Sequence, residues 1–320
     1  MSDDLALAVF ASATNAHLVR PPAGRRWADH VRSFDARAYA ARLGAHGLRF
    51  VPRAGLPLLL RAIHDPPPGL FLRGAGDAGL LARPAVAVVG ARACSGYGAS
   101  VARMLGRELA AAGLVVVSGM ARGVDAEAHR GALEADGATV AVLGCGVDRD
   151  YPAAHAQLAR RIAEQGLVVS EYAPGVEPAP WRFPARNRII AGLCAATVVV
   201  EARERSGALI TADLALEEGR EVFAVPGEIG SAHSSGTNAL LKLGAAPLTA
   251  AGDVLASYGL AGDACDEPHE LLALLPASVD ELSRITGRTA AELGRELVEL
   301  ELAGRARADE GIYRSIVPRG

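Results

Sequence analysis

The central part of the chain alternates between short apolar runs rich in β-branched residues and segments with helical spacing. Strands are expected at residues 85–89, 114–118, 139–143, 167–170, 197–201 and 221–225. Helices are expected between them at residues 98–112, 125–135, 153–165 and 209–218. Such alternation produces a mostly parallel sheet with right-handed crossovers and helices on both faces. The sequence therefore predicts an α/β fold, with an extended Rossmann-like domain over residues 69–260.

The segment before this domain has a different pattern. Residues 1–68 carry apolar residues at helical spacing in the segments 5–13, 27–43 and 56–63. The prolines at 66–68 end that pattern and suggest a linker. We expect a small helical N-terminal domain here, with no residues of evident chemistry.

Residues 266–320 form a third pattern, after a polar linker at 263–268. Helices are expected at residues 271–275, 278–286 and 289–302. Ser278 and Thr289 each stand three residues before a glutamate, which is the spacing of a capping box. A two-stranded wing that turns at Glu310-Gly311 should follow, and three helices with such a hairpin predict a C-terminal winged-helix domain.

Net charge limits where a nucleic acid could bind. The formal net charge is −3, so a contact with phosphates requires a local basic patch. Residues 82–123 carry five arginines and one glutamate, whereas residues 261–320 carry seven arginines and twelve acidic residues. The positive field therefore belongs to the sheet domain, and the winged helix is expected to be a protein contact or a regulatory module.

Cysteine spacing and the N-terminus bear on the compartment. Cys94, Cys145, Cys194 and Cys265 are widely spaced and form no CxxC or Cys/His pattern, so we expect reduced thiols, no metal site and no cofactor. The acidic start at Asp3-Asp4 is unlike a signal peptide, and no apolar stretch reaches the ~20 residues that span a bilayer. We expect a soluble, cytoplasmic protein.

Several strands end in glycine-rich or polar loops, which should meet at one edge of the sheet, where such folds bind ligands. These loops are at residues 90–92, 118–123, 144–146, 170–172 and 226–227. Arg92, held at a strand end, is expected to clamp a phosphate. The first loop lacks GxGxxG, and no acidic residue stands where a nicotinamide ribose needs one, so a dinucleotide site is not expected.

Aromatic and basic residues interleave before the run at 197–201. Trp181 and Phe183 are interleaved with Arg182, Arg186 and Arg188. Aromatic faces beside fixed positive charges are what a single-stranded nucleic acid stacks on and pairs its phosphates with. The alternative is that the two aromatic side chains belong to the core and the arginines form a solvated face.

Catalytic patterns are weak in this chain. Ser118, Asp125 and His129 follow one another, but the GxSxG turn of a nucleophile is absent; Asp125 suits a helix N-cap and His129 a helix surface. The runner-up hypothesis is a Rossmann-like enzyme that hydrolyses a nucleotide or its glycosidic bond, with Glu171 or Glu201 as general acid or base. A third is an interaction scaffold without affinity for DNA.

Several sequence blocks resemble one known family, the bacterial DNA-processing protein A (DprA, also called Smf) family. The blocks are VAVVGARACSGYG, VVVSGMARGVDAEAH, VAVLGCGVDRDYP, the segment 170–227 and SSGTNALLKLGA at 234–245. The resemblance implies an extended Rossmann core with a sterile-alpha-motif-like helical domain before it and a winged helix after it. It also implies a non-enzymatic homodimer that binds and protects single-stranded DNA and helps load RecA recombinase onto it in natural transformation.

The same resemblance assigns a DNA site. Arg92 matches the family's arginine in the first loop, and Phe183 with residues 186–188 matches its DNA-contacting block. A lysine used by some relatives falls near Pro180, and Arg182 is expected to supply its charge here. The full predicted site consists of Arg92, Ser118, Gly119, Arg122, Gly144, Gly146, Trp181, Arg182, Phe183, Arg186, Asn187 and Arg188.

Overall fold

The computed structural model describes residues 2–260, 270–302, 306–309 and 311–315. Contacts divide the chain into two compact units, Met1–Ala261 and Gly262–Gly320, each with a hydrophobic core of its own. None of the described helices is long and apolar enough to cross a membrane.

The first unit is built on one large sheet. Its strands are β1 (Leu48–Pro52), β2 (Gly69–Arg73), β3 (Ala85–Val89), β4 (Val115–Ser118), β5 (Thr139–Leu143), β6 (Leu167–Ser170), β7 (Ala196–Val199), β8 (Glu221–Ala224) and β9 (Ala246–Pro247). Their order among the described residues is β1-β2-β6-β5-β4-β3-β7-β8-β9. Pairing is parallel from β6 to β9, and β1 and β2 are antiparallel additions at one edge. The predicted mostly parallel sheet is confirmed, and its strand order reverses between β3 and β7, the switch point where such folds bind ligands.

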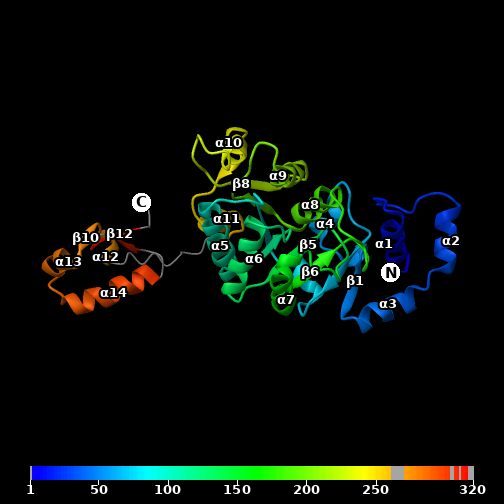
Figure 1. Ribbon diagram of the computed structural model, residues 1–320, viewed down its shortest axis with the longest axis horizontal. Helices are drawn as coiled ribbons and strands as arrows, with labels where there is room; N and C mark the ends of the chain where they lie inside the picture. The colour runs from blue at the N-terminus through cyan, green and yellow to red at the C-terminus, as the bar shows by residue number, and fades with distance from the viewer. Residues whose placement is uncertain (1, 261–269, 303–305, 310, 316–320) are drawn as a thin grey trace. The chain divides into compact units, whose positions relative to one another are not determined.

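Helices cover both faces of this sheet (Figure 1). One face carries α4 (Leu58–Ala62), α8 (Arg182–Leu193), α9 (Gly207–Glu217) and α10 (Ser235–Lys242). The other carries α1 (Ser2–Thr14), α3 (Ala36–Ala45), α5 (Gly96–Ala111), α6 (Val124–Glu134), α7 (Ala156–Gln165) and α11 (Ala251–Ser257). In β3, Val86 and Val88 face one core while Ala87 and Val89 face the other. Because both faces are covered, the central strands are apolar throughout.

Two glycines let α5 and α6 approach each other closely. A Cβ at Gly106 would lie 2.2 Å from the carbonyl oxygen of Ala128, and one at Gly131 would lie 2.0 Å from that of Arg103. Neither position can therefore carry a side chain without moving a helix. This packing fixes the loops that precede the two helices at the carboxyl edge of the sheet.

Residues 1–68 are not a separate helical domain. The helix expected at 27–43 is interrupted by Asp35, which caps α3 and leaves α2 (Arg25–Ser33) as a helix of its own. The strand β1 lies in this region, pairs with β2 and extends the sheet. The boundary expected at residue 68 therefore falls inside one compact unit.

The second unit has the predicted winged-helix arrangement. It contains α12 (Glu270–Ala273), α13 (Val279–Thr286), α14 (Ala290–Leu302), β10 (Ala277–Ser278), β11 (Ala306–Asp309) and β12 (Ile312–Ser315). Ser278 and Glu281 form the expected capping box, and β11 pairs with β12 as the expected wing. The linker expected at 263–268, with Cys265, and Glu310 of the wing turn lie outside the described residues.

Candidate nucleic-acid interface

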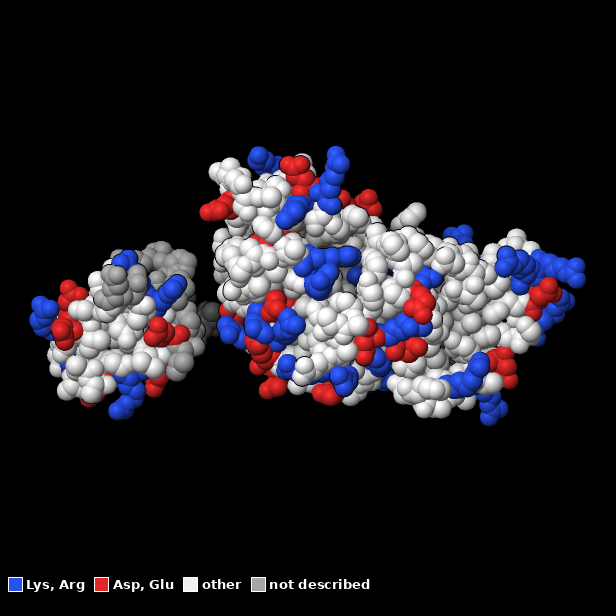
Figure 2. Space-filling view, in the orientation of Figure 1, with Lys and Arg blue, Asp and Glu red and all other residues white. Residues whose placement is uncertain are grey.

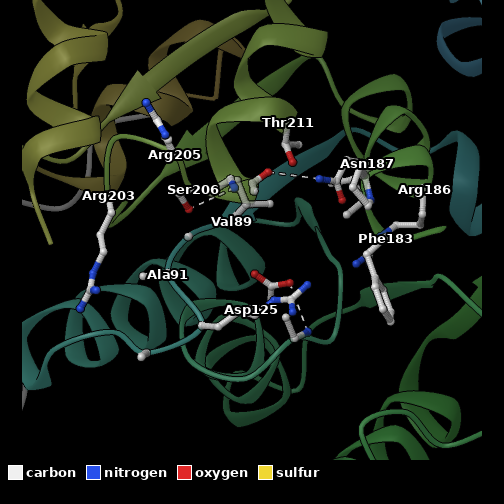
Figure 3. Close-up of a pocket in the computed structure, with 18 residues that line it drawn as sticks. Val89, Ala91, Asp125, Phe183, Arg186, Asn187, Arg203, Arg205, Ser206 and Thr211 are labelled. Carbon is white, nitrogen blue, oxygen red and sulfur yellow. Dashed lines mark hydrogen bonds between the residues drawn. The ribbon is translucent and has the colours of Figure 1, made fainter. Parts of the chain in front are cut away.

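Two adjoining pockets lie at the carboxyl edge of the sheet. The switch pocket, about 360 Å³ in volume, is formed within residues 90–93, 183–187 and 203–208 (Figure 3). The loop pocket, about 210 Å³, is formed within residues 119–122, 143–145 and 151–154. Arg92, Phe183 and Arg186 line both pockets. Of the other predicted site residues, Asn187 lines the switch pocket, and the loop pocket is lined by Gly119, Arg122 and Gly144.

Phe183, in the first turn of α8, lies where the two pockets meet. Its ring stacks on that of Tyr151, with 5.4 Å between centroids and 21° between planes, and the guanidinium carbon of Arg92 lies 5.5 Å from its centroid. Gly144 leaves space for the ring, because a Cβ there would lie 2.9 Å from Phe183 Cδ1. The ring is only half-buried, so part of it is open for a base to stack on.

Arg186 forms a buried, charged floor under both pockets. Its Nη1 donates a hydrogen bond to the carbonyl oxygen of Val142, and a Cβ at Gly119 would lie 2.2 Å from that nitrogen. Burial lowers the pKa of Arg186 to about 10, and the nearby carboxylate of Asp125 opposes this shift. Asp125 in turn accepts hydrogen bonds from the backbone nitrogens of Gly119 and Ala121 at 3.1 and 3.2 Å. The floor is therefore held by groups from β5, α6 and the loop after β4.

Exposed arginines surround this floor. They are Arg92, Arg122, Arg203 and Arg205, and none has an ion-pair partner among residues 2–260. Figure 2 shows a group of Lys and Arg side chains on this face of the first unit, between the positions of α9 and α6 in Figure 1. Sequence reasoning missed Arg203 and Arg205. The sequence signal that could have identified these two arginines is their position between the end of a strand and Ser206, the N-cap of α9.

Glu201 ties the loop that carries Arg92 to the segment that leads into Arg203 and Arg205. It is buried after β7, and its carboxylate accepts a hydrogen bond from Ser95 N at 2.9 Å. Its carbonyl oxygen accepts another from Ala91 N at 2.7 Å. Gly98 leaves space for it, since a Cβ there would lie 2.4 Å from Glu201 Cδ. Glu201 lines neither pocket and has the geometry of a positioning residue, not of a general acid or base.

Arg182 and Arg188, two residues of the predicted site, lie outside both pockets. Arg188 is buried and forms ion pairs with Glu171 at 2.6 Å and Asp65 at 3.3 Å. Arg182 is buried and donates hydrogen bonds to the side chain of Asn15 and to a loop carbonyl. Both arginines therefore hold the N-terminal segment against the sheet. Glu171 is engaged in this ion pair and lines neither pocket.

Ser118, Gly146 and Trp181 also line neither pocket. Ser118 is buried in β4 and donates to a carbonyl oxygen of β3 at 2.7 Å. A Cβ at Gly146 would lie 2.6 Å from Asp148 Oδ1, so this glycine serves the fold of its loop. Trp181 is 41% exposed and packs edge-on against Tyr172, which leaves it at the surface near α8.

Two local expectations for α6 are wrong. Gly123, and not Asp125, is the N-cap, and Asp125 lies within the first turn. His129 is fully buried instead of exposed, and its Nδ1 lies 2.7 Å from Thr139 Oγ1. Burial lowers the pKa of His129 to about 3. The imidazole is therefore neutral and out of reach of any ligand in the pockets.

The fold and the pockets define the chain as a Rossmann-like α/β protein with an arginine-lined site at the switch point, suited to anionic ligands. A family model for DNA recombination-mediator protein A matches residues 49–259, and a model for the DprA winged helix domain matches residues 264–311. The chain belongs to the DNA recombination-mediator protein A (DprA) family.

Individual relatives agree with this assignment. The DNA processing protein DprA of Streptococcus pneumoniae is 48% identical over 202 residues, covering 63% of this chain and 71% of that protein. The putative DNA processing protein DprA of Mycobacterium tuberculosis is 42% identical over 295 residues, covering 87% and 73%. The X-ray structure of the Streptococcus pneumoniae protein has a TM-score of 0.66 at 37% identity, covering 80% of this chain and 93% of that chain.

A second solved structure concerns the single-stranded DNA binding mode of DNA processing protein A from Helicobacter pylori. It has a TM-score of 0.60 at 31% identity, covering 66% of this chain and 95% of that chain. Both structures have the same fold as this chain over most of their own length.

Proposed function

We propose that this chain binds single-stranded DNA across the switch pocket and the loop pocket, and that it serves DNA processing in natural transformation and recombination. The observation that carries the proposal is the partly exposed Phe183 side chain between two pockets, with Arg92 beside it. A base stacks on such a ring while the exposed arginines pair with adjacent phosphates. Stacking does not discriminate strongly between bases, so binding is expected to be largely independent of sequence. The Helicobacter pylori relative, studied for its single-stranded DNA binding mode, supports this proposal.

The family resemblance carries finer proposals. The bound strand is protected and passed to RecA recombinase, and two copies of the chain act as a homodimer. Two sites that hold one strand would bind it with avidity. The acidic winged helix serves as a protein contact or a regulatory module, and the protein works in the cytoplasm.

We propose that the protein acts without catalysing a reaction. A hydrolase at this edge of the sheet would need a carboxylate facing the bound nucleotide. The two candidates are engaged elsewhere, Glu171 with Arg188 and Glu201 with Ser95. Asp125 does line the switch pocket, but its carboxylate accepts hydrogen bonds from the backbone nitrogens of Gly119 and Ala121. A turnover assay with nucleotides and the Glu171→Ala variant tests this point, and turnover that depends on Glu171 would favour the enzyme.

Binding of a fluorescent oligo-dT across a salt series tests the DNA proposal. The double variant Arg92→Ala/Phe183→Ala should lose affinity, because it removes a stacking face worth about 1–3 kcal/mol per base. The slope of log K against log salt should fall by about 0.7, because one phosphate is no longer neutralised by an arginine. Arg25→Ala, in the remote helix α2, is the matched control for charge.

The outcomes separate the site from the function. Tight, salt-sensitive binding by the wild-type protein that is abolished in the double variant supports both. Wild-type affinity and slope in the double variant would refute the site. Absence of binding to single-stranded and duplex DNA by the wild-type protein would refute the function.

A further inference from the structure

The switch pocket carries more positive charge than an internal phosphate needs. In its floor, Arg186 and Asp125 offset each other. This leaves Arg92, Arg203 and Arg205, none of which forms an ion pair with a described residue, although Asp125 attracts Arg92 at longer range. An internal phosphodiester carries one negative charge, whereas a terminal phosphomonoester carries about −1.5 to −2 at neutral pH. Three arginines without an ion pair to a described residue suit the terminal group better.

The start of α9 supplies further donors on the same wall. Ser206 caps the helix by accepting a hydrogen bond from Ala208 N at 3.3 Å, and a helix N-terminus favours an anion. Thr211, in the first turns of the helix, lines the pocket and is only 1% exposed. Its hydroxyl forms no hydrogen bond with any described residue, and Figure 3 shows it on the pocket side. This hydroxyl is therefore available to donate a hydrogen bond to a ligand in the pocket.

This wall is held in place by its own contacts. The carbonyl oxygen of Arg203 accepts a hydrogen bond from Ser206 N at 3.0 Å. Asn187 Nδ2 on α8 donates to the carbonyl oxygen of Gly207 at 3.2 Å and so joins the opposite walls. The intervening Glu204 does not line the pocket. A volume of about 360 Å³ is at the small end for ligand pockets, which suits one nucleotide and not a strand that passes through.

We propose that the switch pocket receives the terminal nucleotide of a DNA strand. Arg203, Arg205 and Thr211 hold its terminal phosphomonoester, next to Arg92. The adjoining nucleotide stacks on Phe183 toward the loop pocket. This inference rests on the proposed function and deepens it, because it makes the protein prefer phosphorylated strand ends.

Three labelled oligo-dT probes of equal length test the inference, one with a 5′-phosphate, one with a 3′-phosphate and one with hydroxyls at both ends. The wild-type protein should bind one phosphorylated probe about tenfold more tightly than the hydroxyl probe, since charge-assisted hydrogen bonds contribute on this scale. Arg203→Ala/Arg205→Ala and Thr211→Val should each reduce that ratio, the double variant to about one. Arg25→Ala/Arg26→Ala removes two exposed arginines from α2 and should keep the wild-type ratio.

Each result decides between explanations. Preference for the 5′- or the 3′-phosphate supports the inference and assigns the polarity of the strand. Equal, tight binding of all three probes overturns the inference and leaves the proposed function intact. A preference that persists in the double variant and in Thr211→Val places end recognition elsewhere and also overturns it. Absence of binding to every probe overturns the proposed function itself.

Discussion

Replacing Gly144 with alanine tests whether the Phe183 ring is the surface on which a strand stacks. The new Cβ would lie 2.9 Å from Phe183 Cδ1 and 3.3 Å from Cε1. Carbon atoms prefer a separation of about 3.5–4.0 Å, so the ring has to move by roughly 0.6 Å or more. The backbone at Gly144 is not among the positive-φ positions, so alanine itself is tolerated there.

The expected loss of affinity follows from how much stacking the shift removes. Truncation of a stacking side chain costs about 1–3 kcal/mol per base. A displaced ring still stacks in part, so Gly144→Ala should cost about 1 kcal/mol, which is about fivefold in the dissociation constant. Phe183→Ala should cost more, because it removes the ring.

Fluorescence anisotropy with oligo-dT and a double-mutant cycle give the decisive comparison. In the Phe183→Ala background, Gly144→Ala should have no further effect, because there is no ring left to displace. Gly252→Ala in α11 is the matched control, since a Cβ there meets nothing within 4 Å. Wild-type affinity in Gly144→Ala, or additive losses in the double variant, would refute the reasoning.

Two further predictions concern stability. Arg188→Ala leaves the buried carboxylate of Glu171 without its ion-pair partner, while Asp65 keeps its contact with His17, and should lower the free energy of unfolding by about 3–5 kcal/mol in urea titrations; its folded fraction should bind oligo-dT with wild-type affinity, and weakened binding would contradict the structural role of this arginine. His129 is buried with its pKa lowered to about 3, so only the unfolded chain takes up a proton as the pH falls below about 6.5. The free energy of unfolding should therefore fall by about 2 kcal/mol between pH 7 and about pH 5 because of His129 alone. His129→Gln should weaken this pH dependence, measured by urea titrations at several pH values. An unchanged pH dependence in the variant would refute the role of His129.

Local patterns were enough to predict the central sheet but not its edge. The parallel strands can be predicted from the sequence because each is a continuous apolar run followed by a helix. The strand β1 instead lies next to prolines and within a region of helical spacing. Among the described strands it pairs only with β2, which in turn pairs with β6 about a hundred residues later. Such antiparallel edge pairing depends on distant partners, so the sequence around residues 48–52 reads as part of a helical region.

Some residues of the predicted site meet at one edge of the sheet and others do not. Four predicted residues meet at the pockets, because the loop after β3 and the first turns of α8 lie at the same carboxyl edge of the sheet. These residues are Arg92, Phe183, Arg186 and Asn187. The predicted site also includes Arg182, which directly precedes Phe183 in the sequence. In a helix, successive residues turn by about 100°, so neighbours in one run of arginines point to different surroundings.

What separates a binding arginine from a structural one here is the partner and not the residue type. Arg188 forms ion pairs with acidic residues that lie 17 and 123 positions away in the chain. No local sequence pattern predicts such a pairing. Arg203 and Arg205 are exposed, and neither forms an ion pair with any residue that the structure describes. The charge available to a ligand is therefore set by which carboxylates the fold brings close. A count of the arginines in residues 181–188 overestimates the positive charge that is available to a ligand. Part of that charge is carried by the loop before α9, which has no conspicuous pattern in the sequence.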